Sequence, residues 1–262
     1  RDAGLVGRTV RDIHVHWPRS LALPDVAQFR RILRGRRIED ITRRAKYVVF
    51  QLDGGWWLIV HLRMTGRFAV CTPDTPRDSH EHVVLLLDDG RQVRFHDTRK
   101  FGRWSLVRNP ADVLGKLGPE PLARSFTAEA LQRALGSHAR MLKPLLLDQT
   151  VLAGLGNIYV DEALWEARLH PCRSSTTLTP DEYRRLHAAI RTVLRRGLAN
   201  MGTTLGNGET NFYSVGRRAG RNADGLRVFR RTGMACPRCG AAIVRLVVGQ
   251  RSTHVCLSCQ RA

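Results

Sequence analysis

The sequence predicts an α+β fold, in which an N-terminal antiparallel β-sandwich is followed by a helical domain and a small C-terminal ribbon. Three observations predict it. Short β-rich runs joined by tight turns fill roughly the first 110 residues, helical periodicity follows from about residue 125, and two CxxC pairs lie near the end of the chain. A chain of 262 residues is long enough for more than one domain. We therefore expect three domains, at 1–113, 114–230 and 231–262.

The N-terminal strands are expected to pair as hairpins. KYVVFQL (46–52) is followed by Asp-Gly-Gly and WWLIVHL (56–62), and HVVLLL (82–87) is followed by Asp-Asp-Gly and QVRFHD (92–97). An Asp-Gly turn between β-rich runs is a strong hairpin signal. DVAQFRRIL (25–33) is expected to form a helix among these strands. The pattern indicates an antiparallel sheet folded into a sandwich or a barrel.

The second part of the chain is expected to be helical. After a proline-rich linker at about 110–125, apolar residues recur with helical spacing. Helices are expected over 127–135, 143–149 and 157–169, and from 180 onward. Thr179 can cap the last helix, Pro180 suits its first turn, Glu182 completes a capping box, and Gly202 is expected to end it.

The chain is strongly basic, with 43 Lys and Arg against 23 Asp and Glu and a formal net charge of +20. This excess cannot be buried, so it creates a surface field that attracts a polyanion, and nucleic acid is the first candidate. An arginine-rich proteome explains the excess less well, because acidic residues would rise in parallel. No apolar run approaches the ~18 residues of a membrane span. Without a secretory signal, the protein is expected to be cytoplasmic.

Four cysteines predict a structural zinc site. Cys236, Cys239, Cys256 and Cys259 form two CxxC pairs, which favour metal over disulfides in a chain without a secretory signal. The residues between the pairs predict two strands with Gly249 near their turn, a zinc ribbon whose core is too small to fold without metal. Four thiolates fill a tetrahedral site, so one Zn²⁺ is expected, with no open position for catalysis.

Two residues suit anion binding, each with a simpler alternative. Arg251 lies at the expected turn of the ribbon and is either a solvated surface arginine or a phosphate-binding tip. Asn157 follows Gly154 and Gly156 at the expected start of a helix, where free N–H groups attract anions. The same residue also suits a plain N-cap.

Several phrases, in order along the chain, resemble one known family. They are RRAKYVVFQL (43–52), HLRMTG (61–66), HEHV (80–83), DTRKFG (97–102), LGPEPL (117–122), GLGNIYVDEALW (154–165), GTTL (202–205) and the cysteine ribbon with QRST. Together they extend over nearly the whole chain. On these phrases the chain resembles the Fpg/Nei family of base-excision repair enzymes, and within it the formamidopyrimidine-DNA glycosylase branch.

The resemblance implies both a fold and an activity. The family has a β-sandwich, a helix–two-turn–helix domain and a zinc finger, with a DNA groove between them. It implies a monomeric glycosylase and AP lyase that acts on double-stranded DNA with damaged bases or abasic sites. The damaged base, 8-oxoguanine or a formamidopyrimidine, is flipped out of the duplex. A Schiff base then forms at the sugar C1′, and β- and δ-elimination cut the strand.

The resemblance also implies residue roles. Lys46 would contact phosphate and act as an acid in β-elimination. Arg251 and Asn157 would clamp phosphate, and Arg251 would donate a proton in δ-elimination. Further DNA contacts are implied at His61, His80 and His138.

Met64, Arg99 and Phe101 are implied to fill the space left by the flipped base, with Arg99 facing the orphaned cytosine. A thioether, a flat cation and an aromatic ring suit a stacked void. Taken singly, Met64 and Phe101 fit an ordinary core equally well, and the order and spacing of the motifs favour the functional reading.

Three features depart from the family pattern. The family begins with a mature Pro-Glu whose secondary amine is the nucleophile, whereas this sequence opens RDAGLVGRTV. We expect a start placed too late, and we expect these residues alone to bind DNA without cleaving it efficiently. Arg63 stands where the family usually has glycine, and it either reaches phosphate or alters how the void is filled. The stretch 206–225 stands in place of the lesion-capping loop and is atypical, so the preferred lesion stays open.

The alternative function is therefore a lesion- or abasic-site-binding module without catalysis. A zinc-ribbon accessory protein would explain the charge and the cysteines, but not HLRMTG or DTRKFG.

Overall fold

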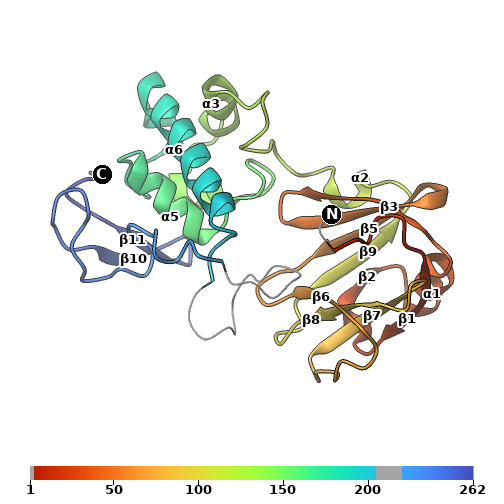
Figure 1. The fold of residues 1–262 in the computed structure, drawn as a ribbon. Helices are drawn as coiled ribbons and strands as arrows, with labels where there is room; N and C mark the ends of the chain where they lie inside the picture. Colours follow the sequence, from red (N-terminus) through yellow and green to blue (C-terminus); the bar gives the residue numbers. More distant parts are fainter. Residues whose placement is uncertain (1–2, 205–219, 262) are drawn as a thin grey trace. The chain divides into compact units, whose positions relative to one another are not determined.

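The computed structural model describes residues 3–204 and 220–261, and these form two compact units (Figure 1). The first unit comprises residues 3–116 with 201–204 and 220–221, and the second comprises 117–200 and 222–261. Residues 206–219 of the stretch predicted to be a surface loop lie outside the described residues.

The first unit contains two β-sheets. One has the order β1-β7-β8-β6, formed by β1 (Val10–Val15), β7 (Glu81–Leu87), β8 (Gln92–His96) and β6 (Arg67–Cys71). The other has the order β2-β9-β5-β4-β3, formed by β2 (Leu21–Leu23), β9 (Arg103–Val107), β5 (Trp56–His61), β4 (Tyr47–Leu52) and β3 (Ile38–Arg44). Both predicted hairpins are present, as β4–β5 and β7–β8. The short β2 departs from the predicted antiparallel pattern because it runs parallel to β9.

The core of the first unit lies between the two sheets, which confirms the predicted sandwich. Phe95 of β8 and Trp104 of β9 lie on opposite sheets and meet edge to face, with 5.4 Å between their ring centroids. The predicted helix is α1 (Val26–Leu33), and Phe29 joins the same core. Asp25 caps α1 by accepting a hydrogen bond from the Gln28 amide at 3.0 Å.

The predicted linker is not wholly irregular, because it contains the short helix α2 (Ala111–Leu114). Val113 and Leu114 pack against a small apolar cluster that is separate from the main core and consists of Val49, Ile59 and Val107.

The second unit contains α3 (Ala128–Gly136), α4 (Leu142–Leu147), α5 (Asn157–Glu166), α6 (Pro180–Ala199) and a hairpin of β10 (Val244–Val248) and β11 (Arg251–Val255). The capping box of α6 is confirmed: Thr179 Oγ1 accepts from the Glu182 amide at 3.2 Å, and the Thr179 amide donates to Glu182 Oε2 at 2.9 Å. Each described helix is too short or too polar to cross a lipid bilayer.

Helix α5 is the buried centre of this unit. Residues 160–165 are all buried, including the carboxylates Asp161 and Glu162, so the helix is covered on every side. It ends at Glu166, earlier than the sequence predicts, and Arg168 adopts a positive φ of 59° just beyond it. A left-handed residue at this position ends an α-helix.

Candidate nucleic-acid interface and metal centre

Three predicted void-filling residues of the first unit form one exposed cluster, here called the stacking cluster: Met64, Arg99 and Phe101. Met64 follows β5, and the other two lie between β8 and β9. The Arg99 guanidinium lies 4.8 Å from the centroid of the Phe101 ring, and Arg99 Nη1 lies 3.2 Å from Met64 Sδ. Met64 and Phe101 are 55% and 47% exposed, so neither is core filler. Exposed aromatic, thioether and guanidinium groups in contact suit stacking on bases.

His61, at the end of β5, lies near the positive charges of Arg63 and Lys46. The Tyr47 and His61 rings meet edge to face at 4.7 Å. Burial, with the positive charges of Arg63 and Lys46, lowers the pKa of His61 to about 4. The imidazole is therefore neutral at pH 7. Its Nδ1 accepts the backbone N–H of Arg63 at 2.9 Å, which leaves the proton on Nε2 as a donor. His61 can thus offer phosphate a neutral hydrogen bond, whereas Lys46 offers a charge.

The lowered pKa of His61 predicts a pH dependence of stability. Between about pH 6.5 and pH 4, His61 is protonated in the unfolded chain and neutral in the folded chain. The free energy of unfolding therefore has its whole contribution from His61 above this range of pH, and it falls as the pH drops through the range. Replacing His61 with Gln removes this contribution. The free energy of unfolding, measured in urea at about pH 7 and about pH 5, should then fall less on acidification than in the unchanged protein. Equal falls in the two proteins would contradict the assignment.

Arg63 occupies a strained backbone position, with a φ of 57°. A side chain there costs about 1–2 kcal/mol, and glycine is free of this cost. We predict that Arg63→Gly stabilises the protein by about 0.5–1 kcal/mol, after the greater entropy of glycine in the unfolded chain is subtracted. Arg63→Ala is the matched control, because it removes the same charge and keeps the strain. Thermal or urea unfolding of both variants measures the difference, and equal stabilities would refute the strain.

His80 lies in a group of histidines beside the loop between β8 and β9, which carries Arg99 and Phe101. Its ring centroid lies 5.6 Å from that of His96 and 6.5 Å from that of His82. The His80 carbonyl accepts the amide of Asp97, which directly precedes the loop, at 2.9 Å. Burial lowers the pKa of His82 and of His96.

His138 is the third candidate DNA contact in the second unit. It is half-buried between α3 and α4, where its carbonyl accepts from Ser175 Oγ and from the Arg140 amide. Among the described residues, no hydrogen bond joins His138 to Asn157 or Arg251.

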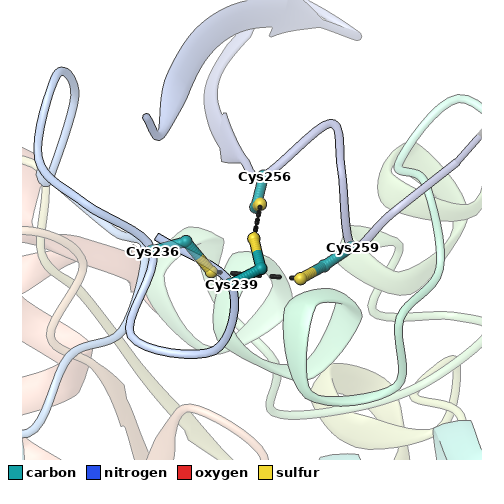
Figure 2. A group of neighbouring side chains, drawn as sticks. All are labelled: Cys236, Cys239, Cys256 and Cys259. Atoms are coloured by element: carbon teal, nitrogen blue, oxygen red, sulfur yellow. Dashed lines mark hydrogen bonds between the residues drawn. The ribbon is translucent and has the colours of Figure 1, made fainter. Parts of the chain in front are cut away.

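The four predicted metal ligands converge (Figure 2). All four sulfur atoms lie within 4.8 Å of one another, with Sγ–Sγ distances of 4.0 Å for Cys236–Cys259 and 3.4 Å for Cys239–Cys256. A tetrahedral zinc site with Zn–S bonds of about 2.3 Å needs sulfur atoms about 3.8 Å apart, so these residues fit one structural zinc ion. Trp165 of α5 supports the site, because its Nε1 lies 3.4 Å from Cys236 Sγ.

Asn157 and Arg251 are joined through the ribbon. Asn157 is the first residue of α5, the N-cap is Gly156, and the Asn157 side chain makes no capping bond, so the N-cap reading was wrong. The Asn157 side chain turns instead to the ribbon, where Nδ2 donates to the Ser252 carbonyl at 3.0 Å. Arg251 begins β11 directly before Ser252 and is exposed. The start of α5 and the start of β11, which carries the exposed Arg251, therefore lie side by side.

A buried ion pair that the sequence analysis missed holds this arrangement. Lys143 and Asp161 are fully buried and 2.5 Å apart, and Lys143 Nζ also donates to the Ser252 carbonyl at 2.8 Å. The other carboxylate oxygen of Asp161 accepts the His254 amide at 2.9 Å and lies 3.1 Å from His254 Nδ1. Burial lowers the pKa of Lys143, and Asp161 opposes that shift.

Glu162 anchors the chain segment that leads into the ribbon. Its carboxylate accepts the backbone amides of residues 227–229, at 2.9–3.1 Å. The available signal in the sequence was the pair Asp161–Glu162 inside the otherwise apolar run YVDEALW.

Family models match the chain in order along its length. Residues 2–104 match the formamidopyrimidine-DNA glycosylase N-terminal domain, 117–207 match the formamidopyrimidine-DNA glycosylase H2TH domain, and 233–262 match a zinc finger found in FPG and IleRS. The chain belongs to the formamidopyrimidine-DNA glycosylase family. This membership confirms the resemblance drawn from the sequence phrases, and the zinc-finger match agrees with the four converging thiols.

Members of the formamidopyrimidine-DNA glycosylase family match the chain over its whole length. It is 45% identical over 261 residues to the enzyme of Protochlamydia amoebophila, covering 100% of this chain and 95% of the relative. It is 48% identical over 258 residues to that of a Roseiflexus species, covering 97% and 92%.

Solved structures of the Lactococcus lactis protein share the fold. One is a mutant in complex with Fapy-dG-containing DNA, and another is a complex with DNA containing an abasic site. Each has a TM-score of 0.90 and 34% identity, and covers 99% of this chain and 94% of the other.

Proposed function

We propose that the chain is a base-excision DNA repair glycosylase and AP lyase that removes oxidised purines, 8-oxoguanine and formamidopyrimidines, from double-stranded DNA. The observation that carries the proposal is the exposed stacking cluster, in a chain that matches this family from end to end. Two structures of the Lactococcus lactis protein contain Fapy-dG DNA and abasic-site DNA, which correspond to a substrate and to the state after base removal in this chemistry.

The stacking cluster suits the step in which the base leaves the duplex. Flipping a nucleotide costs a few kcal/mol in lost stacking and pairing. Met64 and Phe101 can occupy the gap, and the Arg99 guanidinium can donate hydrogen bonds to the base left without its partner.

The other candidate residues suit the phosphate backbone. Lys46 and His61 lie together in the first unit, and Asn157 and Arg251 lie together in the second. We assign Lys46 an acid role in β-elimination and Arg251 a proton-donor role in δ-elimination. His80 and His138 are proposed as further DNA contacts.

The chemistry itself requires an amine nucleophile. The amine attacks the sugar C1′, and the bond from C1′ to the base breaks with its electron pair leaving on the base. The amine gives up its proton, and the sugar ring then opens. The C1′–O4′ bond breaks, O4′ takes up a proton, and C1′ and the amine nitrogen form an iminium. The iminium acidifies the C2′ proton, so that loss of this proton expels the 3′ phosphate and breaks the C3′–O bond. The family resemblance assigns this amine to the proline of the family's mature Pro-Glu.

Borohydride trapping tests the proposal. The chain, with the family's Pro-Glu start placed ahead of it, is incubated with duplex containing one 8-oxoguanine or one formamidopyrimidine, and reduction is expected to leave a covalent protein–DNA adduct. No adduct on either duplex would overturn the proposal. The chain beginning at Arg1 tests the alternative of a binding module, which an adduct from that form would exclude.

The phosphate role of Arg251 predicts a change in salt dependence. Arg251→Ala should weaken binding to all duplexes alike and reduce the slope of log affinity against log salt by about one. Zinc content should be unchanged, because the exposed Arg251 side chain is not a ligand. Fluorescence anisotropy over a series of salt concentrations measures the slope. Arg184→Ala on α6 removes another exposed arginine and is the control. Identical slopes for the two variants would show that Arg251 makes no phosphate contact.

We further propose that the protein acts in the cytoplasm as a monomer, with domains at 1–113, 114–230 and 231–262.

A further inference from the structure

One buried carboxylate joins the two chain segments that carry the stacking cluster. Asp97 is fully buried at the end of β8. One of its oxygens accepts the hydroxyl of Thr65, and the other accepts the Gly102 amide at 2.7 Å. Thr65 Oγ1 in turn accepts the Arg99 amide at 3.2 Å. Thr65 directly follows Met64, and Gly102 directly follows Phe101. Each member of the cluster is therefore at most one residue away from this hydrogen-bonded group.

The backbone of Asp97 is held as firmly as its side chain. Its amide donates to the His80 carbonyl at 2.9 Å, and its carbonyl lies 2.9 Å from His82 Nε2. There is no room for a side chain at the far end of the loop, because a Cβ on Gly102 would lie 2.4 Å from the Phe95 ring and 3.1 Å from Asp97 Oδ2. The absence of a side chain at Gly102 is what lets its amide reach the carboxylate.

The partners of Asp97 explain why a carboxylate is needed here. A buried carboxylate is costly unless hydrogen bonds replace its hydration. Among the described residues, no salt bridge neutralises Asp97. Its side chain instead accepts one hydrogen bond from a hydroxyl and one from a backbone amide. Both donors belong to the loops of the stacking cluster. Hydrogen bonds to an ionised acceptor are stronger than those between neutral groups. The exposed side chains of Met64 and Phe101 have little packing of their own to fix them.

We propose that Asp97 is the positioning residue of the stacking cluster. It holds Met64, Arg99 and Phe101 together before DNA binds, so that binding energy is not spent on ordering two loops. The inference rests on the proposed function, in which the cluster fills the gap left by a flipped base. Asp97 then determines how much more tightly the protein binds DNA that lacks a stacked base than it binds intact DNA. It makes no contribution to the electrostatic attraction of the phosphate backbone.

Binding to two duplexes tests the inference. One duplex carries a tetrahydrofuran abasic-site analogue, and the other is intact and otherwise identical. The variants are Asp97→Ala and Thr65→Val, and Thr65→Val keeps the shape of the side chain while removing the hydroxyl between Asp97 and Arg99. The ratio of the two affinities should fall by roughly tenfold or more in both variants, the size expected for losing a hydrogen bond to a charged group. Affinity for the intact duplex and its salt slope should stay as in the unchanged protein.

Thr65→Ser restores the hydroxyl and is the rescue control, so it should keep the original ratio. If Asp97→Ala does not fold, as judged by cooperative thermal unfolding, the pair Thr65→Val and Thr65→Ser decides the matter. Folded variants with an unchanged ratio would overturn the inference, as would equal losses of affinity for both duplexes. If the unchanged protein shows no preference for the abasic duplex, the proposed function fails instead.

Discussion

Asp161→Ala is expected to destabilise the protein by about 3–5 kcal/mol, because it leaves one half of a buried ion pair without its partner. Asp161 and Lys143 are fully buried and 2.5 Å apart. Without the carboxylate, burial and the positive charge of Arg251 act unopposed on the pKa of Lys143 and drive it lower still. The His254 amide, which donates to Asp161 at 2.9 Å, also loses its acceptor. Urea unfolding at neutral pH measures the loss.

A double variant separates stability from the placement of the phosphate-binding residues. Lys143→Met combined with Asp161→Leu removes both charges together, and such replacements cost far less than removal of one partner. Most of the stability should therefore return. The double variant still lacks the bond from Lys143 Nζ to the Ser252 carbonyl, the same carbonyl that Asn157 holds. DNA affinity should accordingly stay below that of the unchanged protein. A loss of less than about 1 kcal/mol in Asp161→Ala would contradict the account, because breaking a buried pair costs more than this.

Removal of zinc is expected to unfold the ribbon. The free energy of zinc binding, on the order of 10 kcal/mol, is also what stabilises the folded ribbon, and it is lost with the metal. Apart from the ligands Cys236 and Cys256, the buried apolar cluster of this region consists of Trp165, Val228 and Ile243. So small a core cannot hold a two-stranded hairpin. Since Arg251 begins β11, the proposed phosphate contact should be lost together with the ribbon.

Hydrogen exchange after chelation shows which part of the chain unfolds when zinc is removed. Amides of 233–261 should exchange rapidly, while those of the β-sandwich, whose core holds Phe95 and Trp104, should stay protected. Cys256→Ser should reproduce the effect of chelation on exchange and on DNA affinity. The matched control is Cys172→Ser, which alters an exposed cysteine outside the four ligands. Retention of zinc and of DNA affinity by Cys256→Ser would contradict a structural role of the metal.

Most of the regular structure was predictable because its signals are local. Asp-Gly turns, the capping box from Thr179 to Glu182 and the CxxC pairs depend on residues within a few positions of one another. Predictions failed where distant contacts decide. Asn157 has the right residue type for an N-cap, yet its side chain bonds to Ser252, 95 residues away. The short β2 runs parallel to β9, a pairing that no local pattern of either strand indicates.

The candidate site was predictable as a set of motifs and not as an arrangement. The phrases HLRMTG and DTRKFG placed Met64, Arg99 and Phe101 among the candidates, but they do not state that Arg99 and Met64, 35 residues apart, are in contact. Nor does the residue type show that His61 is neutral, because its pKa depends on burial and on the charges of Arg63 and Lys46.

The sequence by itself determined the α+β class, the zinc ligands and the family, because hydrophobic period, cysteine spacing and ordered motifs are properties of the chain. Only the tertiary structure decided which polar side chains hold the site together. Asp97 resembles any surface carboxylate in the sequence, and the apolar run around Asp161 does not show which groups bond to its carboxylate. The two carboxylates act in this way because the fold buries them and supplies donors from distant residues, Thr65 for the first and His254 for the second. The cost of burying a charge is offset only where such donors converge, and that convergence exists only in the folded chain.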